Sequence, residues 1–261
     1  MTTSNESYRW TSISKPLFAL VAIAALSLGC ATYHGTATAA QPAVVAREGQ
    51  WTMVPRFPQV LQANDDDCGA AALASVLRYW GHPASPESID ATIGRGDRRL
   101  SAGDMQARAR SLGLHSYVFF RGTMKDIVRE LEQGRPVIVG LGKMIDDKKA
   151  LSHYEVVVGY EPQQKKVLLL DPGRGWQVDS LEGFAKEWAL SNAVTMVALP
   201  GNRVGAAGTD AQAALATDEQ GYANREATSP DAKKYKAGDV IVISATTLAI
   251  VLLVVLIIIL I

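Results

Sequence analysis

The chain is short of residues that several common classes of protein require. It has two cysteines, Cys30 and Cys68, among 261 residues, so Cys68 has no disulfide partner if Cys30 is cleaved off or lipidated. Its 26 basic and 26 acidic residues cancel, which removes the electrostatic reason to expect a nucleic-acid partner. No G-x-x-x-x-G-K-S/T run occurs, so the chain has no nucleotide-binding P-loop. No repeat recurs at the periods of solenoid proteins.

Apolar residues gather in a run near the start of the chain. Residues 16–29 follow basic residues and end in small ones, which is the layout of an export signal. Residues 1–30 are therefore interpreted as a signal peptide, and the residues before Cys30 favour the lipoprotein type, with the lipid on that cysteine. Cleavage at the Ala-Thr-Ala of 37–39 and an uncleaved membrane anchor are the alternatives. Each of the three places the following domain outside the cytoplasm.

A second apolar run, uncharged from residue 240 onward, predicts a transmembrane helix over 239–261, because about 20 helical residues span the roughly 30 Å of a bilayer core. Residues 31–50 are interpreted as a spacer and 51–200 as the folded domain. Residues 201–238 are rich in Ala, Gly, Asp and Thr and are expected to form a flexible linker. The expected location is a bacterial cell envelope, with the domain membrane-anchored and facing the periplasm.

Cys68 begins a stretch with helical periodicity. Apolar residues follow it at i, i+3, i+4 and i+7 spacing, namely Leu73, Val76, Leu77 and Trp80. Asp67 suits the N-cap and Gly81 suits the stop. Cys68 would then lie in the first turn, where the positive end of the helix dipole favours a thiolate. A lone cysteine in an exported domain is either a buried, inert residue or a reactive nucleophile.

The remaining patterns predict an α+β fold. Helices are expected at 86–93, 101–112 and 123–133, and the last two begin with capping-box-like pairs. Strands are expected in the β-branched and apolar runs at 116–120, 136–141, 154–160, 166–170 and 194–199. Because helices come first and strands dominate later, we expect the helix of Cys68 to pack on an antiparallel sheet.

A predicted hairpin supplies the partners that a cysteine nucleophile needs. His153 opens its first strand and Asp171 closes its second, each nine residues from Pro162 in the turn. Antiparallel pairing would bring the two nearly opposite one another, where a carboxylate fixes the imidazole tautomer and stabilises its charged form. If the hairpin packs against the start of the Cys68 helix, the chain holds a nucleophile, a base and an orienter. Gln62, on the loop before that helix, could donate to a developing oxyanion together with the Cys68 backbone N–H.

Taken together, these motifs resemble the bacteriocin-processing double-glycine leader peptidases, which are papain-like cysteine peptidases. The matching features are Gln62-x5-Cys68-Gly69, Tyr79-Trp80-Gly81, His153 before a valine-rich strand, Asp171-Pro172, and a closing helix at 180–188. The resemblance covers about residues 51–200 and implies a papain-like fold. It also implies roles for four residues: Cys68 as nucleophile, His153 as general base, Asp171 as orienter and Gln62 as oxyanion donor.

The resemblance implies cleavage of a peptide or small protein precursor, often after a Gly-Gly pair, with an export system as a candidate partner. A papain-like acyl transferase or peptidoglycan amidase would use the same residues with another acceptor. A catalytically silent peptide-binding domain would keep the fold without the chemistry. No cofactor and no metal are expected, because the acidic run at 65–67 suits a solvated loop with one N-cap.

The other polar candidates are assigned no catalytic role. His34 and His82 lie in a spacer and a loop, and His115 has no carboxylate partner evident from the sequence. Arg174 and Trp176 could line a substrate groove or serve the surface and the core.

Overall fold

The structure is a computed structural model that describes residues 35–93, 99–146, 149–200, 219–236 and 238–241. These residues all belong to one compact unit, Thr32–Ile261. The elements follow in the order β1 (Thr38–Ala39), α2 (Pro42–Val45), β2 (Thr52–Met53), α3 (Cys68–Tyr79), α4 (Pro86–Ile93), α5 (Ala102–Ser111), β3 (Leu114–Phe119), α6 (Met124–Glu132), β4 (Val137–Met144), β5 (Lys149–Glu161), β6 (Lys166–Asp171), β7 (Gly175–Ser180), α7 (Leu181–Ala189), β8 (Thr195–Pro200), η1 (Pro230–Lys234) and β9 (Gly238–Ile241).

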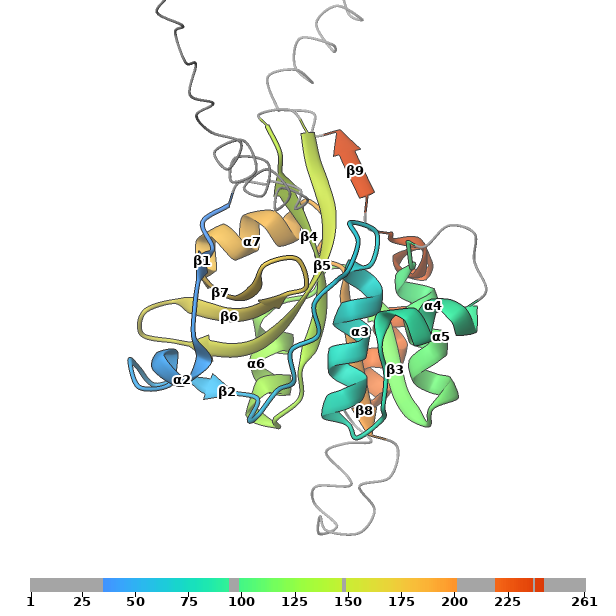
Figure 1. Ribbon diagram of the computed structural model, residues 1–261, viewed down its shortest axis with the longest axis horizontal. Helices are drawn as coiled ribbons and strands as arrows, with labels where there is room; N and C mark the ends of the chain where they lie inside the picture. Colours follow the sequence, from blue (N-terminus) through green and yellow to red (C-terminus); the bar gives the residue numbers. More distant parts are fainter. Residues whose placement is uncertain (1–34, 94–98, 147–148, 201–218, 237, 242–261) are drawn as a thin grey trace, which may run out of the picture. The chain divides into compact units, whose positions relative to one another are not determined.

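An antiparallel sheet organises the described part of the chain. Its nine strands pair in the order β1-β7-β6-β5-β4-β8-β3, with β2 and β9 also paired to β5. The long strand β5 runs through the middle of this arrangement (Figure 1). Residues 150–157 of β5 pair with β4 on one edge. The opposite edge of β5 is therefore shared by β6, which pairs with residues 156–161, and β9, which pairs with residues 149–152. Residues 153–155 lie on that edge between β6 and β9.

Helix α3 packs on β5 and β6, because its predicted apolar face is the face that is buried. Leu73, Val76 and Leu77 have almost no exposed surface. The helix ends before Gly81, whose φ of 87° confirms the predicted glycine stop. The capping boxes that begin α5 and α6 are also present. The prediction of an α+β fold with the Cys68 helix on an antiparallel sheet is therefore confirmed.

The predicted spacer over 31–50 is partly folded onto the sheet. Strand β1 pairs with β7, with Thr38 opposite Val178, and Val45 of α2 is buried. The backbone N–H of Gln50 donates to Glu161 Oε1 at 3.1 Å. A two-residue strand and a four-residue helix are too short to show periodicity, so the sequence did not reveal them.

The predicted flexible linker over 201–238 is wrong for residues 219–236. Residues 219–227 form a helix, and its Tyr222 is fully buried. The Tyr222 ring stacks on Phe119 with centroids 5.6 Å apart, and its hydroxyl donates to Glu130 Oε1 at 2.7 Å. One aromatic anchor in a polar segment was too weak a signal to predict this helix. Residues 201–218 lie outside the described residues.

The two predicted membrane segments fall largely outside the described residues. The signal peptide at 1–30, with Cys30, is not among them, and neither are residues 242–261. The start of the predicted transmembrane helix, 239–241, belongs to strand β9. Within the part of the chain that the structure describes, no helix is both long enough and apolar enough to span a bilayer.

Candidate active site

Cys68 is the first residue of α3, and its surroundings decide between the inert and the reactive alternative. The thiol is free and only 1% exposed. The start of the helix abuts β5, since a methyl group on Gly69 would lie 3.2 Å from Tyr154 Cδ2. Cys68 nevertheless has a polar neighbour, because it is hydrogen-bonded to the His153 side chain. The sulfur is therefore buried against an imidazole rather than sealed in hydrocarbon.

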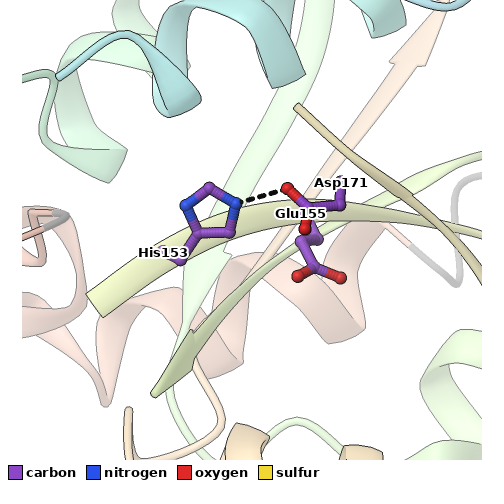
Figure 2. Close-up of side chains that lie close together, drawn as sticks. All are labelled: His153, Glu155 and Asp171. Carbon is purple, nitrogen blue, oxygen red and sulfur yellow. Dashed lines mark hydrogen bonds and ion pairs between the residues drawn. The ribbon is translucent and has the colours of Figure 1, made fainter. Parts of the chain in front are cut away.

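His153 and Asp171 meet, although not in the predicted register. A β-bulge interrupts the pairing of β5 with β6, and beyond it Val156 lies opposite Leu170. Continuing this register places Asp171 opposite Glu155 rather than opposite His153. His153 lies two residues further along the same face and reaches Asp171 diagonally. Its Nε2 lies 2.7 Å from Asp171 Oδ1 (Figure 2).

The hydrogen bonds fix the imidazole between the carboxylate and the thiol. Asp171 Oδ1 also accepts from the backbone N–H of Gly173 at 2.8 Å, which holds the carboxylate in place. Because Nε2 faces Asp171, Nδ1 is the ring nitrogen left for Cys68. Burial lowers the pKa of His153, but the charges of Cys68 and Asp171 and hydrogen bonds to both outweigh burial and raise it well above its ordinary value. An imidazolium beside the sulfur stabilises a thiolate.

Gln62 lies at the same corner of the molecule. Its backbone N–H donates to Pro172 O at 2.9 Å, which ties the loop before α3 to the end of β6. A methyl group on Gly173 would lie 3.6 Å from Gln62 Cδ and 3.4 Å from Asp171 Oδ1. The structure thus brings Gln62 next to Asp171. The donation of a hydrogen bond by the Gln62 side chain to an oxyanion stays a prediction.

We expect Gln62→Ala to lower kcat by about 10²–10³-fold with a smaller change in KM, because an oxyanion donor acts mainly on the transition state. Steady-state cleavage of a peptide substrate measures this effect. Gln59→Ala, three residues earlier on the same loop, is the matched control and should leave kcat unchanged. An unchanged kcat in Gln62→Ala would remove Gln62 from the mechanism.

Three buried charged residues that sequence analysis missed lie behind the His153–Asp171 pair. Lys143 Nζ is 2.8 Å from Glu155 Oε1 and 2.5 Å from Glu187 Oε2. Burial raises the pKa of Glu155 to about 7, although Lys143 opposes this shift. Burial alone would lower the pKa of Lys143, but the two glutamates raise it above its ordinary value. A glutamate inside a valine-rich strand was the available sequence signal.

The distances in this cluster would also suit a metal ion. Ligand atoms of His153, Glu155 and Asp171 all lie within 4.8 Å of one another. The Lys143 ammonium, however, already lies at Glu155, and His153 Nε2 already faces Asp171. A lysine among the donors supplies the positive charge that a cation would otherwise bring. The residues therefore fit a network of charges better than a metal centre.

The acidic run before α3 belongs to a loop, with one difference from the prediction. Asp67 occupies the N-cap position but makes no side-chain cap hydrogen bond. Its Oδ2 instead accepts from the side chain of Asn64 at 2.8 Å. Asp66 forms an ion pair with Arg99 at 2.8 Å. Asp67 thus stabilises the turn that enters the helix rather than the first helical N–H groups.

The other histidines lie away from Cys68 in sequence, and the structure corrects one expectation about them. His115 has a carboxylate partner after all, because its Nδ1 is paired with Glu219 Oε1. The partner was not evident because it lies 104 residues away in the chain. Both side chains are partly exposed, which suits a surface ion pair. His34 lies outside the described residues.

The fold and the site together define the class of protein: an α+β domain of the papain-like cysteine peptidase type, in which a helix bearing a thiol meets a histidine–carboxylate pair on an antiparallel sheet. The family can also be stated. The model of the Peptidase_C39 like family matches residues 52–196, more than half of the chain, and the chain belongs to this family. The resemblance predicted from the sequence is confirmed.

Individual relatives are distant. LagD of Lactococcus lactis subsp. lactis, described as a lactococcin-G-processing and transport ATP-binding protein, is 24% identical over 129 residues, which are 49% of this chain and 17% of that protein. The peptidase domain of Streptococcus ComA, a bi-functional ABC transporter, is 23% identical and has a TM-score of 0.45 over 56% of this chain and 99% of that chain. A structure described as a C39-like peptidase from Bacillus anthracis is 15% identical, with a TM-score of 0.48 over 57% of this chain and 98% of that chain.

Proposed function

We propose that this chain is a cysteine peptidase that cleaves a peptide or a small protein precursor. One observation supports the proposal above the others. Cys68 at the start of α3 is hydrogen-bonded to His153, and His153 is in turn hydrogen-bonded to Asp171 at 2.7 Å. These are the contacts that a thiol nucleophile, its base and an orienting carboxylate require. Membership of a peptidase family supports peptide bonds as the target.

The first half of the reaction forms a thioester. The Cys68 thiolate attacks the carbonyl carbon of the scissile bond, and the negative charge moves to the carbonyl oxygen. The Cys68 backbone N–H and the Gln62 side chain donate to that oxygen. As the C–N bond breaks, the His153 imidazolium gives its Nδ1 proton to the leaving amine. Asp171 holds the ring so that Nδ1 keeps facing the sulfur.

The second half restores the enzyme. His153, now neutral, takes a proton from a water molecule, and the resulting hydroxide attacks the thioester carbon. The C–S bond breaks, the acid product leaves, and the proton on His153 again stabilises the Cys68 thiolate. An amine in place of water would make the same site an acyl transferase, so the acceptor has to be measured.

The substrate and the location are proposed from the sequence and the relative. LagD is named for lactococcin G processing, which supports a peptide precursor as the first substrate to test. The Gly-Gly-type cleavage site is proposed from the sequence resemblance to double-glycine leader peptidases. The export-signal layout of residues 1–30 and the apolar run from residue 240 support a membrane-anchored enzyme in a bacterial envelope. An export system that delivers the precursor is the corresponding candidate partner.

The full chain in detergent, incubated with a peptide library and analysed by mass spectrometry, tests the proposal. We expect new termini at a restricted set of sites, including peptides with Gly-Gly pairs, and no such termini with Cys68→Ala. Added hydroxylamine or an amine distinguishes hydrolysis from transfer. An acyl transferase would release mainly the product joined to the added amine, whereas a peptidase would release mainly the free acid. A library that stays intact with the wild-type chain, although peptides bind to it, would contradict the proposal and favour a silent peptide-binding domain.

A further inference from the structure

A buried chain of charges ends beside the catalytic pair, and the mechanism above makes no use of it. It runs from Glu187 on α7 through Lys143 on β4 to Glu155 on β5, with contacts of 2.5 and 2.8 Å. All three side chains are buried, and Glu155 has no exposed surface. Buried charges are costly unless they are paired, so each member depends on the next.

Glu155 is the link to the site. The β5–β6 register places it opposite Asp171, and its position two residues after His153 puts it on the same face of β5. Figure 2 shows the Glu155 carboxylate below Asp171 and turned away from the imidazole ring. Lys143 Nζ meets this carboxylate at Oε1.

The charges that face Glu155 come from every neighbouring element. Asp171 on β6 raises its pKa, whereas Lys143 on β4 and His153 on β5 lower it, and burial raises it most. Besides burial, Asp179 and Asp171 raise the pKa of Glu187, the other partner of Lys143. Two carboxylates, Glu155 and Asp171, therefore compete for one imidazolium, and they can both be ionised only if a second cation is close. Lys143 is that cation.

We propose that Glu155 and Lys143 are positioning residues that keep the His153 imidazolium charged, with Lys143 holding Glu155 ionised behind Asp171. Glu155 adds a second negative charge on the Asp171 side of the ring, and Lys143 prevents the two carboxylates from sharing a proton. This role rests on the proposed function, because it concerns the base of that reaction. Neither residue touches the substrate.

The expected sign follows from the charges. A negative charge near His153 favours the imidazolium, so Glu155→Gln should make His153 lose its proton at a lower pH. The effect should be strongest above pH 7, because the pKa of Glu155 is about 7 and below it Glu155 is itself neutral. We expect the His153 titration midpoint to fall by about one pH unit.

NMR titration of the imidazole resonances in the full chain measures this midpoint directly, and the chain has only four histidines. Glu130→Gln is the matched control, because Glu130 is also a fully buried carboxylate and pairs with Arg135 at 3.3 Å. The inference is overturned if Glu155→Gln leaves the His153 midpoint in place, or if Glu130→Gln moves it equally. If Glu155→Gln lowers the His153 midpoint but the wild-type chain cleaves no peptide, the role of Glu155 would be supported and the proposed function contradicted.

Substitutions of Lys143 provide a second, independent test. Lys143→Met should lower the titration midpoint of His153 as Glu155→Gln does, since Glu155 becomes protonated when Lys143 is lost. Lys143→Arg should keep most of the wild-type midpoint. The double variant Lys143→Met/Glu155→Gln should unfold at a higher temperature than Lys143→Met alone, because only Glu187, rather than both glutamates, is then left without its lysine. This double variant also keeps the inference testable if Glu155→Gln does not fold. If the double variant lowered the His153 midpoint by the sum of the two single shifts, Lys143 would not act through Glu155, and the inference would be contradicted.

A different observation concerns access to the nucleophile. A substrate must reach Cys68, yet Cys68 is 1% and His153 3% exposed. Residues 230–236 and 238–241, named here the C-terminal strap, lie directly beside them. The Tyr235 carbonyl accepts from the Tyr154 hydroxyl at 2.6 Å and from the Ala102 backbone N–H at 2.9 Å.

The C-terminal strap also takes the edge of β5 next to the site. In β9, Gly238 lies opposite Ser152, one residue before His153, and Figure 1 shows β9 beside the start of β5. An extended peptide binds most readily by pairing with an open strand edge. The Tyr235 ring packs edge-on against Tyr154, with centroids 5.3 Å apart, which adds a side-chain anchor.

We infer that the C-terminal strap is an autoinhibitory contact that must leave the β5 edge before a peptide reaches Cys68. Tyr235→Ala removes its side-chain anchor and should raise the rate at which a bulky alkylating reagent labels Cys68 by about tenfold or more, with little change for a small reagent. Lys234→Ala is the matched control on the same strap, since Lys234 is exposed and forms an ion pair with Asp231 at 2.8 Å. Labelling needs no substrate, so this inference can stand even if the proposed function fails.

Hydrogen exchange gives the second measurement. When a peptide binds to the Cys68→Ala chain, the amides of the C-terminal strap should lose protection. Tyr235→Ala labelled at the wild-type rate, or a strap that stays protected with peptide bound, would overturn the inference.

Discussion

Cys68→Ala is expected to abolish peptide cleavage, with a loss in kcat on the order of 10⁶-fold, because removal of the nucleophile from a catalytic triad costs about that much. The substitution should leave the fold intact. Alanine is the best helix former, and Ala70, Ala71 and Ala72 follow in the same buried turns. The measurement is kcat on a cleavable peptide, with circular dichroism to confirm the fold.

Cys68→Ser tests the same point with a side chain of similar shape. The hydroxyl can still accept or donate hydrogen bonds, but it is a weak nucleophile next to an imidazole that was matched to a thiol. We expect both variants to bind peptide and neither to cleave it. Cleavage within tenfold of the wild-type rate by either variant would show that the nucleophile lies elsewhere.

His153→Asn should cost nearly as much, on the order of 10⁴–10⁶-fold in kcat, because the ring is both the partner of the thiolate and the proton donor to the leaving amine. It should also change the pH dependence of Cys68 alkylation. The pKa of His153 is raised well above its ordinary value, so the ring stays charged beside the sulfur through neutral pH. Without it, the ratio of the labelling rate at pH 6 to that at pH 9 should fall.

His115→Asn is the matched control for this substitution. His115 is also a histidine beside a carboxylate, Glu219, but it lies on β3 and is assigned no catalytic role. It should leave both kcat and the labelling ratio unchanged. If His153→Asn kept the wild-type ratio, the hydrogen bond between His153 and Cys68 would have no chemical consequence and the proposed mechanism would fail.

Much of the site could be predicted because it depends on local patterns. Helix α3 begins at Cys68 and stops before Gly81, as the apolar spacing and the glycine indicated. The hairpin that joins His153 to Asp171 was also evident, since two β-branched runs flank a polar turn. Each of these signals lies within about 20 residues, where sequence pattern and structure are directly related.

The register of the hairpin could not be predicted. The turn residue Pro162 suggested that His153 and Asp171 face each other, but Glu161 pairs with Lys166, so the turn is centred after Pro162, and a bulge in β5 then shifts the pairing by one residue. Glu155 takes the position opposite Asp171 as a result. A bulge adds one residue to one strand, and nothing in a valine-rich run shows where it will occur.

The charges behind the site and the C-terminal strap escaped prediction for a related reason. Lys143, Glu155 and Glu187 lie on three separate elements, and no local pattern links them to one another. Tyr235 lies more than 80 residues from Tyr154 in the chain. The sequence around it is polar, so it was interpreted as part of a linker.

The order of the residues therefore determined the class of fold, the family and the three groups proposed to react, because helix starts, strand runs and turn positions are set by neighbours in the chain. Folding alone decided which carboxylate faces Asp171, which lysine balances it, and which segment pairs with β5 just before His153. Those contacts depend on the packing of strands and helices from distant parts of the chain. Burial between these elements also shifts the pKa of charged groups.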